Sequence, residues 1–505
     1  MRRSRSIHAL GAALLFALPL PASAQLIRGE SPAGGAAGVT QVYGATPTAL
    51  AAPLTMYLDP VAGVDSGTCT VGSPCQTIAY AKQNIPKHLA YGVTINLAGG
   101  TYNEFAVFDY IDGGAGVAST ITLQGSTWTA FVPTTGPSTG AFTSAAGRVA
   151  TMATATWTVN NLAGSHVKIT SGTKSGNYYP ILLNTATGIT LPLVAADMTA
   201  IATATFELVR PAAIISHAAV AGVNALITNS GSAPLVLNAV DIVGVHFTES
   251  ILLGAASSVT VQNCRMSTTP IAYTIYGPST TASATVTNTY VNAGNTSGLL
   301  VGSATLANSV VGGTATISIS AIARLATTEV LVTGASQGIA LIDTYGGAVS
   351  LSLIGYDFLR SGGTAVNASG YTTLALSVVR GTWPTVTVGI YLDGVKARVT
   401  VQDVVITSST DGIRVATSGN DIALGGTASI TATAYAVNLA YSNTSTKSFS
   451  AGAINNVMVG ASAALSGGTA DINLGGGTTT SLVALRAVPN KTILDATTLN
   501  RAMGY

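Results

Sequence analysis

Hydrophobic and polar residues alternate with a period of two in many short segments of this chain, which are separated by Gly, Asn, Ser and Thr. Such alternation predicts β-strands with one buried side. One type of strand ends in Asn or Asp, as in residues 259–263, 284–288, 304–308 and 399–403. Its central apolar positions form a series with steps of 20 or 25 residues: Val236, Val261, Val286, Leu306, Leu331, Leu351, Leu376 and Val401.

A second type of strand follows the same rhythm, at residues 250–253, 298–301, 338–341, 389–392 and 412–415. Two strand types that alternate within such a repeat predict a solenoid, in which each coil pairs with the next at a spacing of about 4.8 Å. A β-sandwich would lack the constant repeat, and a leucine-rich repeat would contain helical segments. We therefore predict an all-β parallel solenoid.

The polar residues that close the first strand type are expected to form a ladder at one corner of the coils. Short amide and carboxylate side chains there satisfy backbone groups of the turn and tolerate left-handed dihedral angles. We favour this structural role over a ligand-binding ladder. The expected members are Asn238, Asn263, Asn288, Asn308 and Asp403.

Six segments are expected along the chain. The first, 1–24, combines early arginines, an apolar run and Ala22-Ser23-Ala24, the order of a secretory signal peptide. A transmembrane anchor is the alternative, but the run is interrupted by prolines and is shorter than the roughly 20 residues that span a bilayer. The other segments are a flexible leader at 25–54, an N-terminal cap and first coil at 55–125, an inserted small β module at 126–210, parallel coils at 211–485 and a C-terminal extension or cap at 486–505.

The folded body opens with Tyr57-Leu58-Asp59-Pro60 and a Gly/Asp-rich turn, followed by the alternating segment 93–97 and by Gly100-Thr101-Tyr102-Asn103-Glu104. These 48 residues resemble the opening of many secreted parallel β-helix proteins of the pectate-lyase-like superfamily. The resemblance implies a right-handed parallel β-helix with a short capping helix, expected over 77–87. A cap is required because an open end would expose the core and the strand edges.

Residues 126–210 break the coil rhythm with short strands between Gly and Asn turns, which is typical of a small all-β unit. The segments 157–164, 167–173 and 189–191 carry a resemblance to a small module of phage tail proteins and secreted β-helix proteins. Two interpretations have equal weight: the module contacts a partner, or it is a structural bulge of the solenoid.

The chain has three cysteines, and their positions bear on its cellular compartment and on metal binding. Cys69 and Cys75 lie six residues apart in a turn-rich stretch. They are expected to form a disulfide in an oxidising compartment, the alternative being two free thiols. Cys264 lies in an apolar strand pattern and is expected to be a small buried core residue. With five scattered histidines, no metal site is predicted.

Composition narrows the classes of partner. Charged residues are 8% of the chain and the formal net charge is +2, so nucleic acid is not an expected partner. The 48% hydrophobic content excludes a disordered chain. No transmembrane segment is expected in the mature chain. The location is expected to be extracellular or at the cell surface, and an extracellular polysaccharide or a cell-surface glycan is the expected partner.

The densest charge lies between residues 343 and 414. Aligning the second strand type places Asn367 and Asp393 in nearly the same column, with Asp343 one place off. It also places Arg414 one coil from Tyr391.

A site in this region would use Asp393, or Asp343, as acid or base and Arg414 for an anionic group, with Tyr391 as a stacking platform for a sugar and Asn367 beside it. The interpretation that we favour is that these are polar residues at corners and solvated strand faces.

We predict an exported glycan-binding, adhesive or structural protein in preference to an enzyme. The alternative is a polysaccharide lyase or a glycoside hydrolase. Glycoside cleavage requires two carboxyl groups about 5 to 9.5 Å apart, and 19 acidic residues in 505 make such pairs scarce. No cofactor is expected. The family resemblance implies calcium only for a lyase.

Overall fold

The computed structural model describes most of one compact unit, Leu50–Tyr505. The expected signal peptide, nearly all of the leader and Asp343 lie outside the described residues. The described ranges are 52–113, 119–218, 225–245, 249–267, 272–293, 297–313, 317–333, 337–341, 348–369, 373–393, 396–416, 420–439, 455–459, 462–475, 481–485, 493–495 and 501–504.

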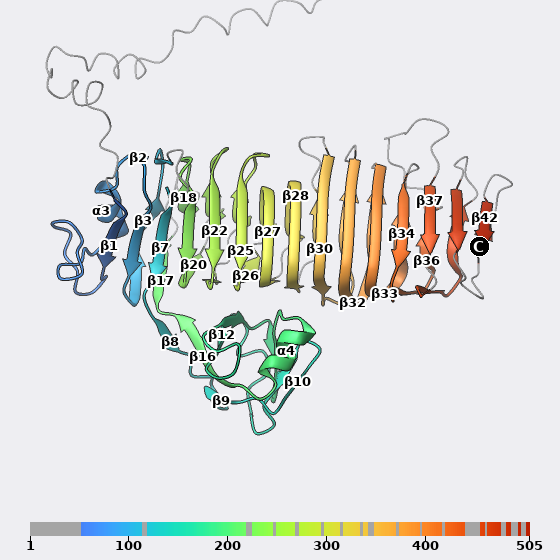
Figure 1. Cartoon of the computed structure of the whole chain (residues 1–505), viewed down its shortest axis with the longest axis horizontal. Coiled ribbons are helices and arrows are strands. Elements are labelled where there is room, and N and C mark those ends of the chain that lie inside the picture. The colour runs from blue at the N-terminus through green and yellow to red at the C-terminus, as the bar shows by residue number, and fades with distance from the viewer. Residues whose placement is uncertain are drawn as a thin grey trace, which may run out of the picture. The chain divides into compact units, whose positions relative to one another are not determined.

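The predicted fold class is confirmed: the chain forms a parallel β-solenoid of about 12 turns (Figure 1). Each coil contributes strands to three faces, here named A, B and C in the order in which the chain visits them. Five long strands continue from one face to the next around the corners without interruption. They are β27 (Ser297–Gly313), β28 (Ile317–Val332), β30 (Ala348–Phe358), β32 (Thr373–Asp393) and β33 (Lys396–Val415).

Face A contains the first strand type of the sequence. The long strands contribute their segments 303–307, 324–328, 348–354, 373–379 and 396–402 to it. Its other strands are β1 (Leu54–Leu58), β3 (Val93–Leu97), β7 (Ile121–Gly125), β19 (Leu235–Asn238), β22 (Ser258–Gln262), β25 (Ser283–Thr287), β34 (Asp421–Gly425), β37 (Asn455–Val459), β40 (Ser481–Leu485) and β42 (Arg501–Gly504).

Face B follows face A across the corner between them, and its separate strands contain two to six residues. Besides segments of the long strands, it contains β4 (Gly100–Asn103), β17 (Ala213–Ala218), β20 (Val240–Val245), β23 (Arg265–Met266), β26 (Tyr290–Ala293), β35 (Ser429–Ala432) and β38 (Ala464–Gly467).

Face C contains the second strand type. Besides segments of the long strands, it contains β5 (Ala106–Val107), β18 (Ala225–Asn229), β21 (Glu249–Leu253), β24 (Tyr273–Gly277), β29 (Gln337–Leu341), β31 (Thr364–Ser369), β36 (Tyr435–Asn438), β39 (Ala470–Gly475) and β41 (Ile493–Asp495).

The apolar positions of successive coils stack into continuous columns inside the solenoid. Val261, Val286 and Val401 are fully buried in one core and belong to one column. The same column on face A includes Leu237, Val261, Val286, Leu306, Thr327, Leu353, Val378 and Val401. On face C the predicted residues Ile251, Leu299, Ile339, Ile390 and Ile413 share one column as expected.

Four positions of the predicted face A series are wrong. Val236 is one residue early, and Leu351 and Leu376 lie in the neighbouring inward column. Leu331 lies on face B, paired with Val310. The inward residue of that coil is Thr327, which a hydrophobic pattern cannot identify because it is polar.

The corner between faces A and B is a stack of left-handed residues. In successive coils these residues have φ between +45° and +60°: Ala239, Asn263, Asn288, Asn308, Glu329, Gly355, Arg380, Asp403 and Gly426. Most residue types avoid this conformation, whereas Asn, Asp and Gly tolerate it. The predicted residues occupy this corner except for Asn238, because Ala239 takes the left-handed position in that coil.

Side-chain amides connect this corner from coil to coil. Asn288 donates from Nδ2 to Asn263 Oδ1 at 3.3 Å, and Asn263 donates to Asn238 Oδ1 at 3.0 Å. Asn238 in turn donates to Gln124 Oε1 at 2.7 Å. Cys264 is buried next to this ladder, and burial raises the pKa of its thiol to about 12.

The N-terminal end is capped by helix α3 (Ile78–Gln83), which is shorter than predicted. Glu104 accepts hydrogen bonds from the backbone N–H groups of Ile78 and Ala79, at the start of this helix. Cys69 and Cys75 form a disulfide in the adjoining loop. The short strands β2 (His88–Leu89) and β6 (Asp112–Gly113) pair beside the cap.

At the other end, the segment that was expected to be an extension or cap contains β41 and β42. These strands continue the parallel pairing, β41 with β39 and β42 with β40.

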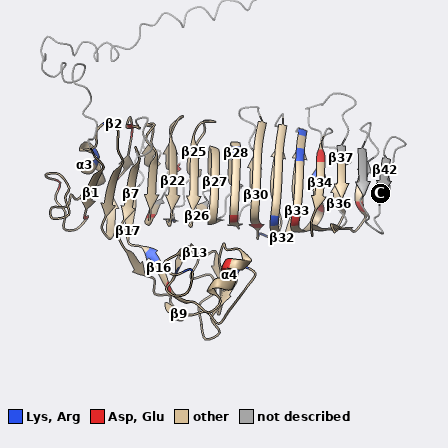
Figure 2. Cartoon of the chain, in the orientation of Figure 1, with Lys and Arg blue, Asp and Glu red and all other residues tan. Residues whose placement is uncertain are grey.

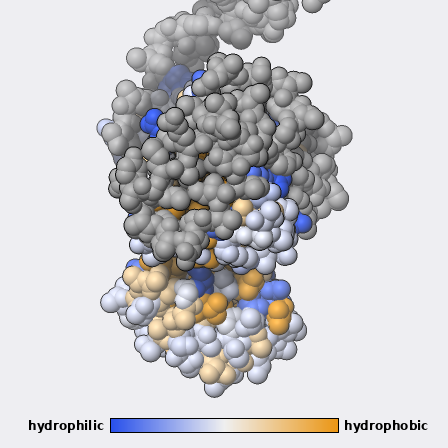
Figure 3. All heavy atoms as spheres, turned by 90° about the vertical axis from the view of Figure 1, so that its right-hand side faces the viewer, coloured by the Kyte–Doolittle hydropathy of each residue, from blue (hydrophilic) through white to orange (hydrophobic). Residues whose placement is uncertain are grey.

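A small antiparallel module is inserted at the A–B corner, between β7 and β17 (Figure 1). It has its own hydrophobic core, which includes Trp157, Phe206 and Ile189. Figure 3 shows that its visible face is mostly pale, with small apolar areas. Its elements are β8 (Trp128–Ala130), β9 (Thr139–Ala141), β10 (Ser144–Ala146), β11 (Val149–Thr151), β12 (His166–Ile169), β13 (Tyr178–Pro180), β14 (Leu183–Asn184), β15 (Gly188–Thr190), α4 (Ala195–Ile201) and β16 (Thr205–Pro211).

Helices α3 and α4 contain six and seven residues. Neither of these helices, the two within the described ranges, has the length or apolar character that crossing a bilayer needs.

The corner ladder leads to a test with two substitutions at one position. Asn263→Ala removes the amide contacts and forces alanine into a left-handed conformation, so we expect a loss of roughly 2 kcal/mol in the free energy of unfolding. Asn263→Gly removes the same contacts but accepts the backbone angle, so its loss should be about 1 kcal/mol. Urea unfolding measures both. Equal losses would contradict a contribution from the backbone conformation.

Candidate functional site

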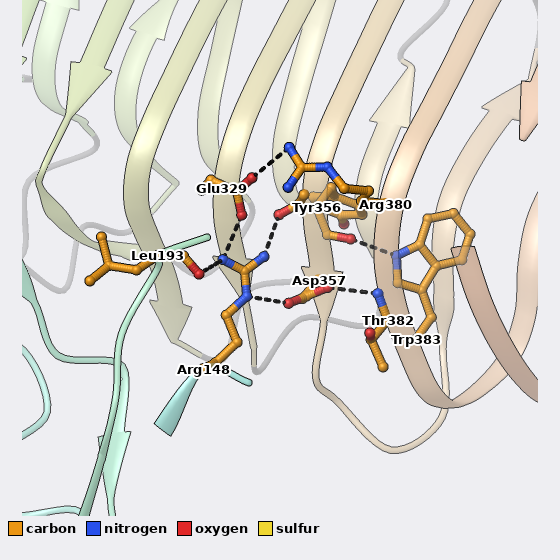
Figure 4. A network of polar contacts seen from close by, with 9 residues as sticks. Arg148, Leu193, Glu329, Tyr356, Asp357, Arg380, Thr382 and Trp383 are labelled. Carbon is orange, nitrogen blue, oxygen red and sulfur yellow. Dashed lines mark hydrogen bonds and ion pairs between the residues drawn. The ribbon is translucent and has the colours of Figure 1, made fainter. Parts of the chain in front are cut away.

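Three polar clusters on the solenoid contain enough charge to be functional sites. The first is a buried network around Arg148, in the turn between β10 and β11 of the module (Figure 4). Arg148 donates from Nη1 to Glu329 Oε2 at 2.7 Å and from Nε to Asp357 Oδ2 at 2.8 Å. It also donates to the carbonyl oxygens of Leu193 at 2.7 Å and Gly355 at 2.9 Å.

The two acidic residues of this network, Glu329 and Asp357, also make contacts with other residues of the solenoid. Arg380 Nη2 lies 3.1 Å from Glu329 Oε1, and Thr382 N donates to Asp357 Oδ1 at 2.6 Å. The side chains of Glu329 and Asp357 are 4% and 7% exposed. Both carboxylates are therefore neutralised by arginine and shielded from water, so neither can act as a nucleophile or a base for a bound glycan.

The Arg148 network joins the module to the solenoid far along the chain from its insertion point. Apolar residues of the two parts also pack together: Leu182 of the module contacts a cluster with Val310 and Leu331 of face B. His166 contacts the carbonyl oxygen of Asn288 through Nε2 at 3.1 Å, and burial lowers the pKa of this imidazole to about 4. These contacts indicate that the network has a structural role in docking the module.

The second cluster is the face C part of the predicted site. Asn367, Tyr391 and Arg414 are directly adjacent in three successive coils. The predicted alignment of Asn367 with Asp393 is therefore wrong, because Asp393 pairs with Ser369. Tyr391 Oη donates to Asp393 Oδ2 at 3.4 Å.

Arg414 is already neutralised by a carboxylate. Its Nε donates to Asp411 Oδ2 at 2.7 Å, and the Asp411 side chain is 3% exposed. Asn438 donates to the same Asp411 oxygen at 3.0 Å. This pairing weakens Arg414 as a receptor for an anionic ligand, while Tyr391 remains partly exposed.

The third cluster lines an open groove of about 490 Å³ on face A. The groove crosses β30, β32, β33 and the start of β34, at the corner that follows face C. Short side chains leave room, and its polar or charged lining residues are Ser350, Thr373, Lys396, Arg398 and Asp421. The short apolar lining residues include Ala323, Ala348 and Ala375.

The residues of the groove are positioned by the register of the coils. Ser350, Ala375, Arg398 and Asp421 are consecutive members of one outward-facing column. All four are exposed or partly exposed to solvent. Figure 2 shows the basic start of β33 beside the acidic start of β34.

The two cations of the groove differ in their surroundings from four arginines elsewhere among the described residues. The side chains of Lys396 and Arg398 form no ion pair or side-chain hydrogen bond with another residue that the structure describes. By contrast, Arg148, Arg265, Arg380 and Arg414 are all ion-paired. Among the residues that the structure describes, no ion pair neutralises the side chains of Lys396 and Arg398, so the groove offers positive charge beside the single acidic lining residue, Asp421.

Sequence reasoning located the region of this groove but missed its main residues. Lys396 and Arg398 fall within the charged stretch 343–414, although neither was singled out. Ser350 and Asp421 carry no local signal, since they join the groove only through the register of neighbouring coils. Asp393 precedes the groove by one corner, on face C.

One further carboxyl group was missed by the sequence analysis. Glu249 at the start of β21 is 7% exposed, and its Oε2 has no hydrogen-bond partner within the described ranges. Burial raises the pKa of this group. A raised pKa is a property of general acids, but no hydrogen bond joins Glu249 to another described carboxyl group.

The described part of the chain contains no set of side chains that could bind a metal ion. No group of three or more His, Cys, Asp and Glu side chains there could hold a metal ion.

No protein-family model and no curated protein sequence matches the chain. Among solved structures, XylC in complex with xylose matches at 10% identity and a TM-score of 0.28, over 75% of this chain and 69% of that chain. The tailspike gp61 of Pseudomonas phage phi297 matches at 11% identity and a TM-score of 0.20, over 76% and 72%. The GH136 lacto-N-biosidase from Eubacterium ramulus matches at 9% identity and a TM-score of 0.26, over 90% and 67%. Likeness at this level carries no argument about function.

The docking role of Arg148 can be tested by its removal. Arg148→Ala leaves Asp357 and Glu329 buried with one cation fewer, so we expect a loss of about 3 to 5 kcal/mol in stability, seen as lost hydrogen-exchange protection in β11 and β12. The matched control is Lys168→Ala, whose partly exposed ion pair with Glu207 should contribute only about 0 to 1 kcal/mol. Similar effects of the two variants would refute the docking role.

Proposed function

We propose that this protein is an extracellular glycan-binding protein whose face A groove holds a polysaccharide without cleaving it. The observation that carries the proposal is the composition of the groove. Hydroxyl groups, short side chains and two cations without an ion-pair partner among the described residues line an open groove along consecutive coils. Such a surface can donate hydrogen bonds to sugar hydroxyl groups over several rungs.

The acid content of the groove favours binding over hydrolysis. Hydrolysis of a glycosidic bond requires a pair of carboxyl groups about 5 to 9.5 Å apart. Asp421 is the single acidic residue among those that line the groove.

Two features support an extracellular location. The sequence begins with the order of charged, apolar and small residues that is typical of an export signal. The disulfide between Cys69 and Cys75 fits an oxidising compartment.

A polysaccharide lyase or glycoside hydrolase is the second candidate function. Its support is the contact between Tyr391 and Asp393 on face C, one corner away from the groove. There Asp393 would act as acid or base, and Tyr391 would stack on a sugar ring. Calcium would be required only by a lyase.

Blocking the groove without changing its charge tests the proposed function. Ala375 is exposed at the centre of the groove, so Ala375→Phe should fill it and lower the affinity for a bound polysaccharide at least tenfold. The control is Thr305→Phe, an exposed face A position outside the groove lining, which should leave the affinity unchanged. Binding is measured by affinity electrophoresis and calorimetry on a panel of soluble polysaccharides.

The same panel distinguishes binding from catalysis. The intact chain is incubated with each polysaccharide, with and without calcium, and unsaturated and reducing ends are measured. We expect neither product. Product that Asp393→Ala abolishes would replace the binding function with the enzymatic one, and binding that survives Ala375→Phe would remove the groove from the proposal.

A further inference from the structure

We propose that the polysaccharide in the face A groove is acidic, lies parallel to the solenoid axis, and carries its acid groups more than one sugar apart. This inference rests on the proposed function. It names the chemical class of the ligand from the positions of three cations: Arg324, Lys396 and Arg398.

The first step concerns the interactions that these three side chains make with the described part of the chain. Arg324 lies on β28, next to the groove residue Ala323, and is exposed. Like Lys396 and Arg398, it forms no ion pair or side-chain hydrogen bond with another described residue. Three cations at one face that have no ion-pair partner within the described ranges favour a ligand that supplies negative charge.

The second step is the direction of the ligand. Arg324, Ser350, Ala375 and Arg398 are consecutive members of one column, each paired with the next. Since the coils are about 4.8 Å apart, the backbones of Arg324 and Arg398 lie about 14 Å apart along the axis. A polymer that meets both guanidinium groups must therefore run along the axis, across the strands.

The third step is the spacing of the acid groups. The two rungs between the arginines carry Ser350 and Ala375, which cannot neutralise a charge. Asp421 places a carboxylate on the rung that follows Arg398. A polymer with an acid on every sugar would bring negative charge to these rungs without a partner, whereas a polymer with spaced acids would not.

The guanidinium groups of Arg324 and Arg398 also restrict which acid groups the ligand can carry. Arginine binds carboxylate and sulfate groups through two parallel hydrogen bonds, so both kinds of acidic polysaccharide share the required chemistry. Lys396 lies on the same strand as Arg398 in the adjacent outward column, paired with Thr373. It adds a point charge at the side of the groove.

The experiment uses the full chain, five soluble polysaccharides and duplex DNA as a competitor. Gellan and hyaluronate carry spaced carboxylates, polygalacturonate carries one on every sugar, and dextran sulfate and dextran form a sulfated and neutral pair. Calorimetry compares the intact chain with Arg324→Gln, Lys396→Gln and Arg398→Gln. Lys168→Gln on the module removes the same charge away from the groove and serves as the control.

We expect gellan or hyaluronate to bind more tightly than polygalacturonate, and dextran not to bind. Arg324→Gln and Arg398→Gln should each lower the affinity about fivefold to tenfold, Lys396→Gln about threefold, and the control less than twofold. Added salt should weaken binding. Dextran sulfate carries sulfate on most of its sugars, so its binding in place of the carboxylated polymers would overturn the proposed spacing and assign the site to densely sulfated glycans.

Other outcomes overturn the inference and are separable from a failure of the proposed function. If only neutral polysaccharides of the panel bind, and Ala375→Phe prevents it, the groove binds glycans but the acidic ligand is wrong. If the tightest ligand is polygalacturonate, the spacing is wrong. If duplex DNA competes equally, the groove is a general polyanion site. If no polysaccharide binds at all, the proposed function itself fails.

Discussion

Every feature of this protein depends on the hydrogen bonding of each coil to the next at one fixed spacing. The backbone of a strand is satisfied only when its neighbour repeats the same path, so a residue at one corner dictates the conformation at that corner in the next coil. The stack of left-handed residues between faces A and B is the clearest consequence. Even Glu329 and Arg380, which gain nothing locally from such a conformation, adopt it.

The same stacking creates the surface chemistry. Side chains that are tens of residues apart in sequence become neighbours about 4.8 Å apart, so a column of outward positions acts as a unit. Arg324 and Arg398 belong to one such column on face A. On face B, outward apolar residues such as Leu331 need a cover, which the module provides together with a buried ion network.

Sequence patterns predicted the solenoid because inward positions on faces A and C recur with little variation. They failed on face B, where β23 has two residues and Leu331 points outward into the module interface. An apolar residue covered by another part of the chain cannot be distinguished by pattern from a core residue. The sequence also did not fix the register between coils. For this reason the predicted site placed Asn367 beside Asp393, whereas Asn367 pairs with Tyr391.

The sequence by itself determined the strand period, the repeat, most of the Asn and Asp residues at the corner between faces A and B, and the scarcity of charge, because these follow from local alternation and composition. Only the tertiary structure decided which charges meet. Coil lengths vary, so the partner of an outward residue is set by the cumulative register of all preceding turns. The pairing of Arg414 with Asp411, and the absence of such a pairing for Arg398 within the described residues, are therefore properties of the assembled stack.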